Sequence, residues 1–171
     1  MKGKWAEGIR PRNFAWVIKD QLAACERPGG YGANHRRVRR QEEIIWLRQQ
    51  DFDIVVSLSQ APHNLHNYDE LAMPYIHRPF PSGDDMAVTL TRLYGELRTM
   101  LDEQRRIVIH RDELSEHVSG LVAGYLVWSG MVPRQPQAVV VTERIFGRPL
   151  GPIGRNIVSV AATLVADAQS A

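Results

Sequence analysis

Apolar positions recur along the chain in two patterns, one typical of strands and one typical of helices. Two short apolar runs, 14–18 and 21–24, are separated by a polar pair and predict a hairpin. The runs 53–59, 75–80 and 106–110 are short, rich in β-branched residues and bounded by polar positions. They predict three further strands, each mostly buried.

Helical spacing is clearest over 86–104, where one apolar face repeats every three or four residues. This face contains Leu90, Leu93, Tyr94, Leu97 and Leu101. Further helices are expected at 35–50, 119–129, 135–146 and 154–168, with a helical turn at 68–73. Since strands alternate with helices, we expect an α/β fold with a mostly parallel sheet of four or five strands, flanked by helices. The 171 residues contain no repeat or linker and predict a single domain, 1–171.

Composition changes this picture little but excludes several classes. With 44% hydrophobic and 23% charged residues, the chain is neither a disordered tail nor a coiled coil. A net charge of +2 favours neither a membrane nor nucleic acid as partner. The basic run 35–40 is followed by Glu42 and Glu43, which is typical of a solvated helix face. The single cysteine, Cys25, and the absence of an apolar leader predict a cytoplasmic protein.

The polar segment 111–118 is the candidate site, because it connects the buried strand 106–110 to the apolar helix 119–129. Ligands of α/β sheets bind beyond the carboxyl ends of the strands. A helix N-terminus adds free N–H groups that attract anions. We therefore expect an anion or another ligand to contact His110, Arg111, Asp112, Glu113, Leu114, Ser115, Glu116 and His117.

This strand, loop and helix resemble those of the cysteine-dependent protein phosphatases, the tyrosine and dual-specificity enzymes. In that family a strand ends in His-Cys, an arginine follows after five residues, and Ser/Thr-Gly then opens the helix. Here the spacing from His110 is kept, but Arg111 stands at the position of the nucleophile and His117 at that of the arginine. The segment His77-Arg78-Pro79-Phe80-Pro81-Ser82 is similar to the one that ends in the general acid, and Ser82 stands in place of that aspartate. The segments 13–18, 27–30 and 53–59 also resemble the family.

The resemblance implies a phosphatase fold that lacks phosphatase chemistry. Arginine is a permanent cation without a lone pair to attack phosphorus. Histidine cannot reproduce the planar two-point contact that arginine makes with phosphate. We therefore expect an inactive, phosphatase-like module that binds or scaffolds another protein, or that holds a phosphate-like anion in the loop. No cofactor is expected, and no metal, since two histidines seven residues apart are a weak ligand pattern.

Two alternatives remain open at this point. The chain could be a phosphoester hydrolase of altered chemistry, in which Asp84 or Asp85 replaces the general acid. It could also be a structural subunit of a larger complex. In the family fold, the turn 147–152 lies near the phosphate loop, so Arg148 or Arg155 could supply a cation there, although a structural role suits them better.

Overall fold

The structure is a computed structural model that describes residues 8–30, 37–62 and 64–170. The chain divides into two compact units. The first comprises Met1–Phe80 and Glu103–Leu114, and the second comprises Pro81–Asp102 and Ser115–Ala171. The expectation of a single domain over 1–171 stays a prediction.

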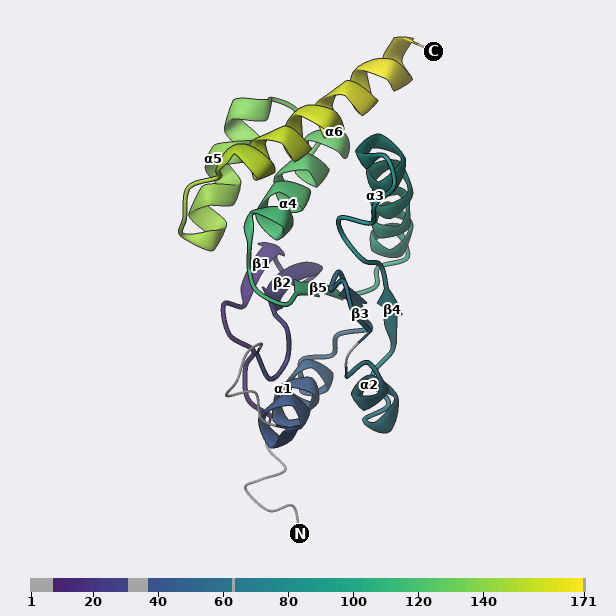
Figure 1. Ribbon diagram of the computed structural model, residues 1–171, viewed down its shortest axis with the longest axis vertical. Helices are drawn as coiled ribbons and strands as arrows, with labels where there is room; N and C mark the ends of the chain where they lie inside the picture. Colours follow the sequence, from purple (N-terminus) through teal and green to yellow (C-terminus); the bar gives the residue numbers. More distant parts are fainter. Residues whose placement is uncertain (1–7, 31–36, 63, 171) are drawn as a thin grey trace. The chain divides into compact units, whose positions relative to one another are not determined.

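Among the described residues, the first unit contains the sheet and two helices, and the second contains four helices (Figure 1). The strands are β1 Ala15–Ile18, β2 Leu22–Glu26, β3 Ile54–Ser57, β4 Tyr75–His77 and β5 Ile107–Arg111. The helices of the first unit are α1 Arg37–Gln49 and α2 His66–Glu70. Those of the second are α3 Met86–Asp102, α4 Glu116–Trp128, α5 Gln135–Phe146 and α6 Pro152–Ser170.

The sheet has five strands in the order β1-β2-β5-β3-β4. The pairs β2–β5, β5–β3 and β3–β4 are parallel, and β1 pairs with β2 in the antiparallel hairpin. The expectation of an α/β fold with a mostly parallel sheet is confirmed. At the centre, His110 of β5 is in register with Cys25 of β2 and with Ser57 of β3. The carboxyl ends of three strands therefore meet around His110.

Helices α1 and α2 pack on one face of the sheet (Figure 1). Their buried side chains Ile44, Leu47 and Tyr68 join alternate residues of the strands in one apolar core. The strand members of this core are Ala23, Cys25, Val55 and Val108. Burial of these side chains is the main force that holds α1 and α2 on the sheet.

The second unit is centred on α4, whose residues 118–127 are all buried. Helix α4 crosses helix α6 at a point where each helix carries a glycine. A Cβ added to Gly120 would lie 2.6 Å from the Cα of Gly154, so this close approach requires a residue without a side chain. The hydroxyl of Tyr94 in α3 donates to the carbonyl of Leu121 at 2.8 Å and ties α3 to α4.

Several expected boundaries were wrong by a few residues. Helix α4 begins at Glu116 and not at 119, so the loop after β5 comprises only 112–115. The carbonyl of Ser115 already accepts the amides of Val118 and Ser119, both at 3.1 Å. An acidic residue in the first turn is favourable at the positive end of the helix dipole, although it gives the sequence the polar character of a loop.

The remaining boundaries differ for similar reasons. Helix α6 begins at Pro152, because proline is well suited to a first helical turn. Helix α2 occupies His66–Glu70 where a turn at 68–73 was expected. The expected loop at 28–32 and the start of the expected helix 35–50 lie partly outside the described residues.

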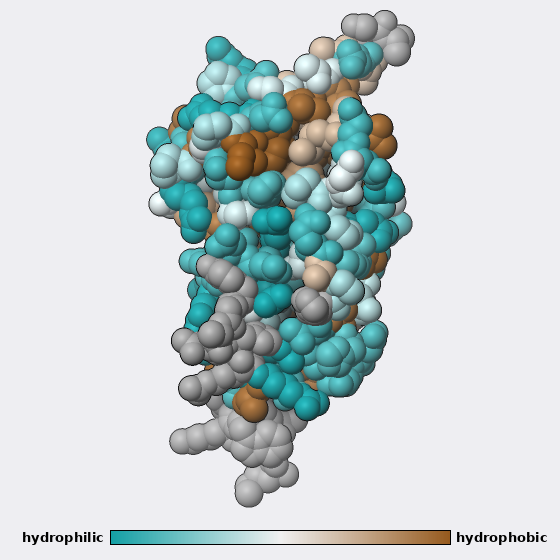
Figure 2. Space-filling model, viewed as in Figure 1, coloured by the Kyte–Doolittle hydropathy of each residue, from teal (hydrophilic) through white to brown (hydrophobic). Residues whose placement is uncertain are grey.

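The surface is mostly hydrophilic on the face drawn in Figure 2, and apolar side chains gather over the α5 and α6 region. The large apolar residues exposed in this unit include Met131, Val140 and Ile153. Within the described part of the chain, no helix is both long and apolar enough to cross a membrane.

Candidate functional site

His110, near the end of β5, has a buried side chain that is 2% exposed. Its Nε2 lies 2.8 Å from the hydroxyl of Tyr68, which projects from α2. Burial lowers the pKa of His110 to about 4, so the imidazole is neutral at pH 7. His110 is therefore an internal polar group that links the central strand to α2.

Arg111 is the last residue of β5 and is half-buried. Its Nε donates to the carbonyl of Phe80 at 2.9 Å, and this contact lies within the first unit. An arginine guanidinium is a cation that donates hydrogen bonds and accepts none. The position expected for a nucleophile thus holds a cation that is anchored to the main chain.

Asp112 and Glu113 follow Arg111 and bring negative charge to the loop. Oδ1 of Asp112 lies 3.3 Å from Nη1 of Arg27, the first residue after β2. Arg27 also donates from Nε and Nη2 to the carbonyl of Gly30, at 3.1 and 3.0 Å. The side chain of Glu113 is exposed, and that of Leu114 is buried. The carboxylate of Asp112 is thus held by an ion pair, and that of Glu113 faces solvent.

Ser115, Glu116 and His117 start the second unit. Ser115 is the N-cap residue of α4 in an extended conformation, and its hydroxyl caps no amide of the described helix. A Cβ added to Gly151 would collide with the carboxylate of Glu116, so this carboxylate lies directly against the turn 147–152. The helix N-terminus, where an anion was expected, therefore already carries an anionic side chain. His117 is half-buried in the first turn of α4.

Arg155 has a structural role within the second unit, as its position next to this turn suggested. Its Nε donates to the carbonyl of Leu150 at 2.8 Å, and its Nη2 lies 3.9 Å from Oε2 of Glu143. Glu143 in turn accepts from the amide of Leu150 at 2.7 Å. These three contacts hold the entrance to α6 against α5.

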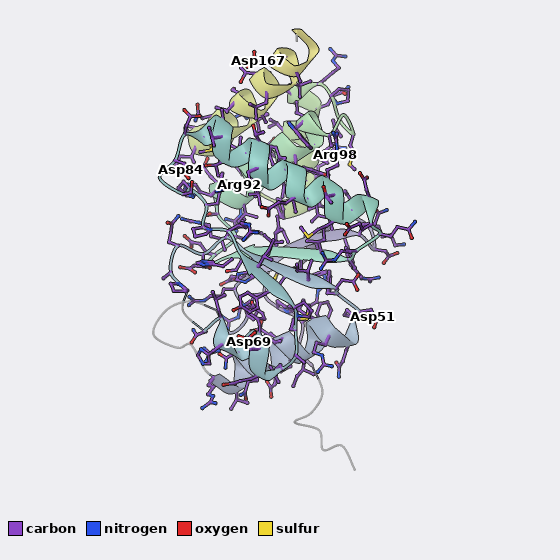
Figure 3. All side chains as sticks on the ribbon, turned by 90° about the vertical axis from the view of Figure 1, so that its right-hand side faces the viewer. Asp51, Asp69, Asp84, Arg92, Arg98 and Asp167 are labelled. Atoms are coloured by element: carbon purple, nitrogen blue, oxygen red, sulfur yellow. The ribbon has the colours of Figure 1, made fainter. Side chains whose placement is uncertain are left out.

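Ser82, Asp84 and Asp85 precede α3, and Figure 3 shows Asp84 at the N-terminal end of this helix. The Oγ of Ser82 lies 2.9 Å from Oγ1 of Thr89. Oδ1 of Asp85 accepts from the amides of Ala87 at 2.9 Å and Val88 at 3.4 Å. Asp85 therefore acts as a cap of α3. Asp84 is exposed beside it, and Arg92 and Arg98 lie further along the same helix.

Cys25 is the only cysteine of the chain and lies in the interior strand β2, with no exposed surface. Burial raises the pKa of its thiol, and the nearby carboxylates of Glu43 and Glu26 raise it further. A thiol attacks as the thiolate. Both the burial of Cys25 and the raised pKa of its thiol disfavour a reaction of this group with a substrate from solution.

The basic residues at the start of α1 are paired within the first unit. Arg37 lies 4.0 Å from Glu70, and Arg39 lies 3.6 Å from Glu43. Arg40 is buried. His35 and Arg36, which belong to the same run, lie outside the described residues. Within the described part of the chain, no three His, Cys, Asp or Glu side chains lie together so that they could hold a metal ion.

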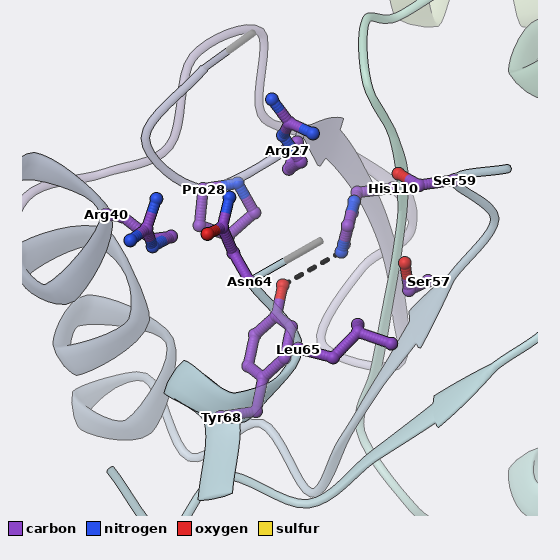
Figure 4. A pocket seen from close by; sticks show the side chains of 9 residues that line it. All are labelled: Arg27, Pro28, Arg40, Ser57, Ser59, Asn64, Leu65, Tyr68 and His110. Carbon is purple, nitrogen blue, oxygen red and sulfur yellow. Dashed lines mark hydrogen bonds between the residues drawn. The ribbon is translucent and has the colours of Figure 1, made fainter. Parts of the chain in front are cut away.

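A small cavity of mixed polar and apolar lining at the carboxyl ends of β2, β3 and β5 was not anticipated (Figure 4). It includes His110, Ser57 and Ser59 together with Arg27 and Arg40. The sequence does contain one signal for it. Ser57 and Ser59 are two polar residues two positions apart at the end of a buried strand, so both side chains point to one face.

Several solved phosphatases are similar in structure to this chain. The kinase associated phosphatase, in a form with its catalytic-site cysteine replaced by serine, aligns with a TM-score of 0.75 and 20% identity over 91% of this chain and 97% of that one. Tk-PTP in its active form aligns with a TM-score of 0.69 and 14% identity, over 88% of this chain and 97% of that one. Human DUSP28 aligns with a TM-score of 0.63 and 10% identity, over 96% of this chain and 99% of that one. No protein-family model and no curated protein matches the sequence.

Proposed function

We propose that this chain, which has the fold of the dual-specificity and tyrosine phosphatases, is a catalytically inactive, phosphatase-like protein that binds another protein. It carries arginine at the position where its resemblance to these enzymes places the nucleophile. The observation that carries the proposal is the pair Arg111 and Cys25. The first occupies the nucleophile position, and the second is the only thiol of the chain and is sealed in β2.

Chemistry by way of cysteine requires an exposed thiolate beside the loop amides. Arg111 offers no electron pair, and its Nε already donates to the carbonyl of Phe80. His117 adds at most two divergent donors in place of an arginine fork. Loss of a general acid alone typically lowers a rate by about 10²- to 10⁴-fold. Together these replacements remove each part of the family's reaction.

A protein partner suits the loop better than a phosphate ester does. Asp112, Glu113 and Glu116 place three carboxylates in the seven residues after the strand, and Glu116 sits at the helix N-terminus itself. These charges oppose an anionic ligand. Apolar side chains exposed on α5 and α6, such as Val140 and Ile153, are of the kind that protein partners cover.

The hydrolase alternative gains no support from the residues before α3. A shifted general acid would need a carboxyl free to donate a proton. Asp85 accepts two amides as a helix cap, and Ser82 is hydrogen-bonded to Thr89. Asp84 is exposed, and its carboxylate accepts from the Oγ of Ser82 at 3.5 Å.

A rescue series tests the proposal. Arg111→Cys alone should leave hydrolysis of aryl phosphates at background, because neither the arginine fork nor the acid is present. The triple variant Arg111→Cys, His117→Arg and Ser82→Asp should gain detectable hydrolysis, about 10²-fold or more above the single variant. Far-UV circular dichroism and thermal unfolding confirm that each variant folds. Strong hydrolysis by the single variant would contradict the roles assigned to positions 117 and 82.

A further inference from the structure

The exposed charges of the segment 131–160 all have one sign. This segment runs from the end of α4 through α5 into α6, and the structure describes all of it. Its exposed charged residues are four arginines, Arg134, Arg144, Arg148 and Arg155. Its only carboxylate, Glu143, is half-buried. The charge that this segment presents to solvent is therefore positive.

Three of these arginines lie where α5 ends and α6 begins. Glu143 of α5 accepts from the amide of Leu150 and lies 3.9 Å from Nη2 of Arg155, so the last turn of α5 is tied to the first turn of α6. Ile153 belongs to this first turn, since α6 begins at Pro152. Val140 lies one turn before Arg144 on the same face of α5. We call this surface the α5–α6 corner; it comprises Val140, Arg144, Arg148, Ile153 and Arg155.

The two aliphatic side chains of the α5–α6 corner face solvent. Val140 is 46% exposed and Ile153 is 49% exposed. Figure 2 shows apolar side chains gathered over the α5 and α6 region. Single exposed apolar residues are common on protein surfaces. Their combination with arginines, in a segment without an exposed carboxylate, is typical of protein interfaces, in which Arg is enriched and Asp and Glu are depleted.

The carboxylates of α4 and α5 that lie nearest to the corner are turned inward. Glu143 is engaged by Leu150 and Arg155, and Glu116 of α4 lies against Gly151 with its Oε1 buried. Asp167 is twelve residues beyond Arg155 in α6, about 18 Å along the helix. The three arginines of the corner thus exceed the two nearby carboxylates by one charge and are more exposed than they are. The corner therefore attracts negative charge.

From this arrangement we infer that the α5–α6 corner binds an acidic segment of another protein that carries apolar side chains, and this partner chemistry rests on the proposed protein-binding function. The arginines attract the carboxylates of the segment, and Val140 and Ile153 contact its apolar side chains. A nucleic acid or a membrane fits less well, because single strands stack on aromatic rings and membrane-bound helices insert Trp, Phe or Leu. The uncharged side chains of the corner are only a valine and an isoleucine.

The test is a selection of random peptides displayed on phage against the full wild-type chain. The enriched peptides should carry a net negative charge together with apolar residues. The most enriched peptide is then synthesised, and its dissociation constant for the chain is measured by fluorescence anisotropy. The affinity should fall as sodium chloride is added, because the charges of an exposed surface are screened by salt.

Two corner variants, each with a matched control, locate the binding. The double substitution Val140→Gln with Ile153→Gln, and the single substitution Arg144→Glu, should each weaken peptide binding by about tenfold or more. The controls are Val88→Gln and Arg92→Glu in α3, where Val88 is 60% exposed and Arg92 is exposed. Both controls should leave the affinity unchanged. Thermal unfolding shows that each variant is folded.

Three results would overturn the inference. They are a selection without enrichment, enriched peptides of net positive charge, and peptides that bind the corner variants as tightly as the wild type. In the last case the chain would still bind protein, so the proposed function would stand, whereas phosphate ester hydrolysis by the wild type would overturn that function whatever the corner binds. Binding to single-stranded DNA or to phosphatidylglycerol vesicles that the corner variants lose would assign the corner to a nucleic acid or a membrane instead.

Discussion

The crossing of α4 and α6 gives a prediction whose size can be worked out from the coordinates. In Gly120→Ala the new Cβ would lie 2.6 Å from the Cα of Gly154, 2.9 Å from its carbonyl oxygen and 3.0 Å from Cδ1 of Ile157. Two of these atoms belong to the main chain, so they cannot rotate away as the end of a side chain would. The helices must therefore move apart, and the buried contacts around the crossing weaken.

The expected magnitude combines two opposing effects. Forcing an extra methyl group into a packed core costs about 1–3 kcal/mol. Alanine is a better helix former than glycine by about 1 kcal/mol, which offsets part of this cost. The net loss of up to about 2 kcal/mol corresponds to a midpoint lower by up to about 8 °C for a chain of this length.

Gly95→Ala is the matched control. Gly95 lies in α3, and an added Cβ there meets no atom within 4 Å. Only the gain in helix propensity remains, so this variant should be more stable than the wild type by up to about 1 kcal/mol. Thermal and urea unfolding, followed by circular dichroism, measure both. If Gly120→Ala proved as stable as Gly95→Ala, the close approach of α4 and α6 would be wrong.

Three further predictions concern single groups. Asp85→Ala removes a cap of α3 and should destabilise the chain by about 1 kcal/mol in urea unfolding, whereas Asp84→Ala should change little; equal losses would argue against the cap. Burial lowers the pKa of His110 to about 4, so the unfolded chain binds a proton at this position before the folded chain does as pH falls. The free energy of unfolding of the wild type should therefore fall by up to about 3 kcal/mol between pH 6.5 and 4, and that of His110→Gln should not show this loss. Urea unfolding that depends on pH equally in both proteins would refute this. Cys25 should resist alkylation at pH 8 until denaturant is added, and fast labelling of the folded chain would show that the thiol is accessible.

Much of the fold followed from the sequence because its elements have strong periodicity. The runs around Val55 and Val108 are too apolar and too short for anything but interior strands, and both are central in the sheet. The apolar face of α3 was expected to end at Leu101, but Met100 is buried in its place. At the last turn of a helix, adjacent apolar residues are equally plausible members of a face, and packing decides between them.

The first residue of α4 could not be predicted from the periodicity of the sequence. Glu116 and His117 are polar and suggested loop, although their position near the helix N-terminus is favourable for an acidic residue. The partners of the loop residues were likewise hidden. Asp112 pairs with Arg27, 85 positions away, and Arg111 contacts the carbonyl of Phe80. Such contacts depend on strand order, which a single sequence does not specify.

The most direct measurement for the central claim is the rate of phosphate release from an aryl phosphate and from a phosphotyrosine peptide. The wild-type chain, Cys25→Ser and Arg111→Ala should all match the buffer blank, because the only thiol is buried and Arg111, a cation, stands where the family resemblance places the nucleophile. The contradictory result would be hydrolysis by the wild type that persists in Cys25→Ser and disappears in Arg111→Ala. That outcome would show that the loop after β5 is still an enzyme active site.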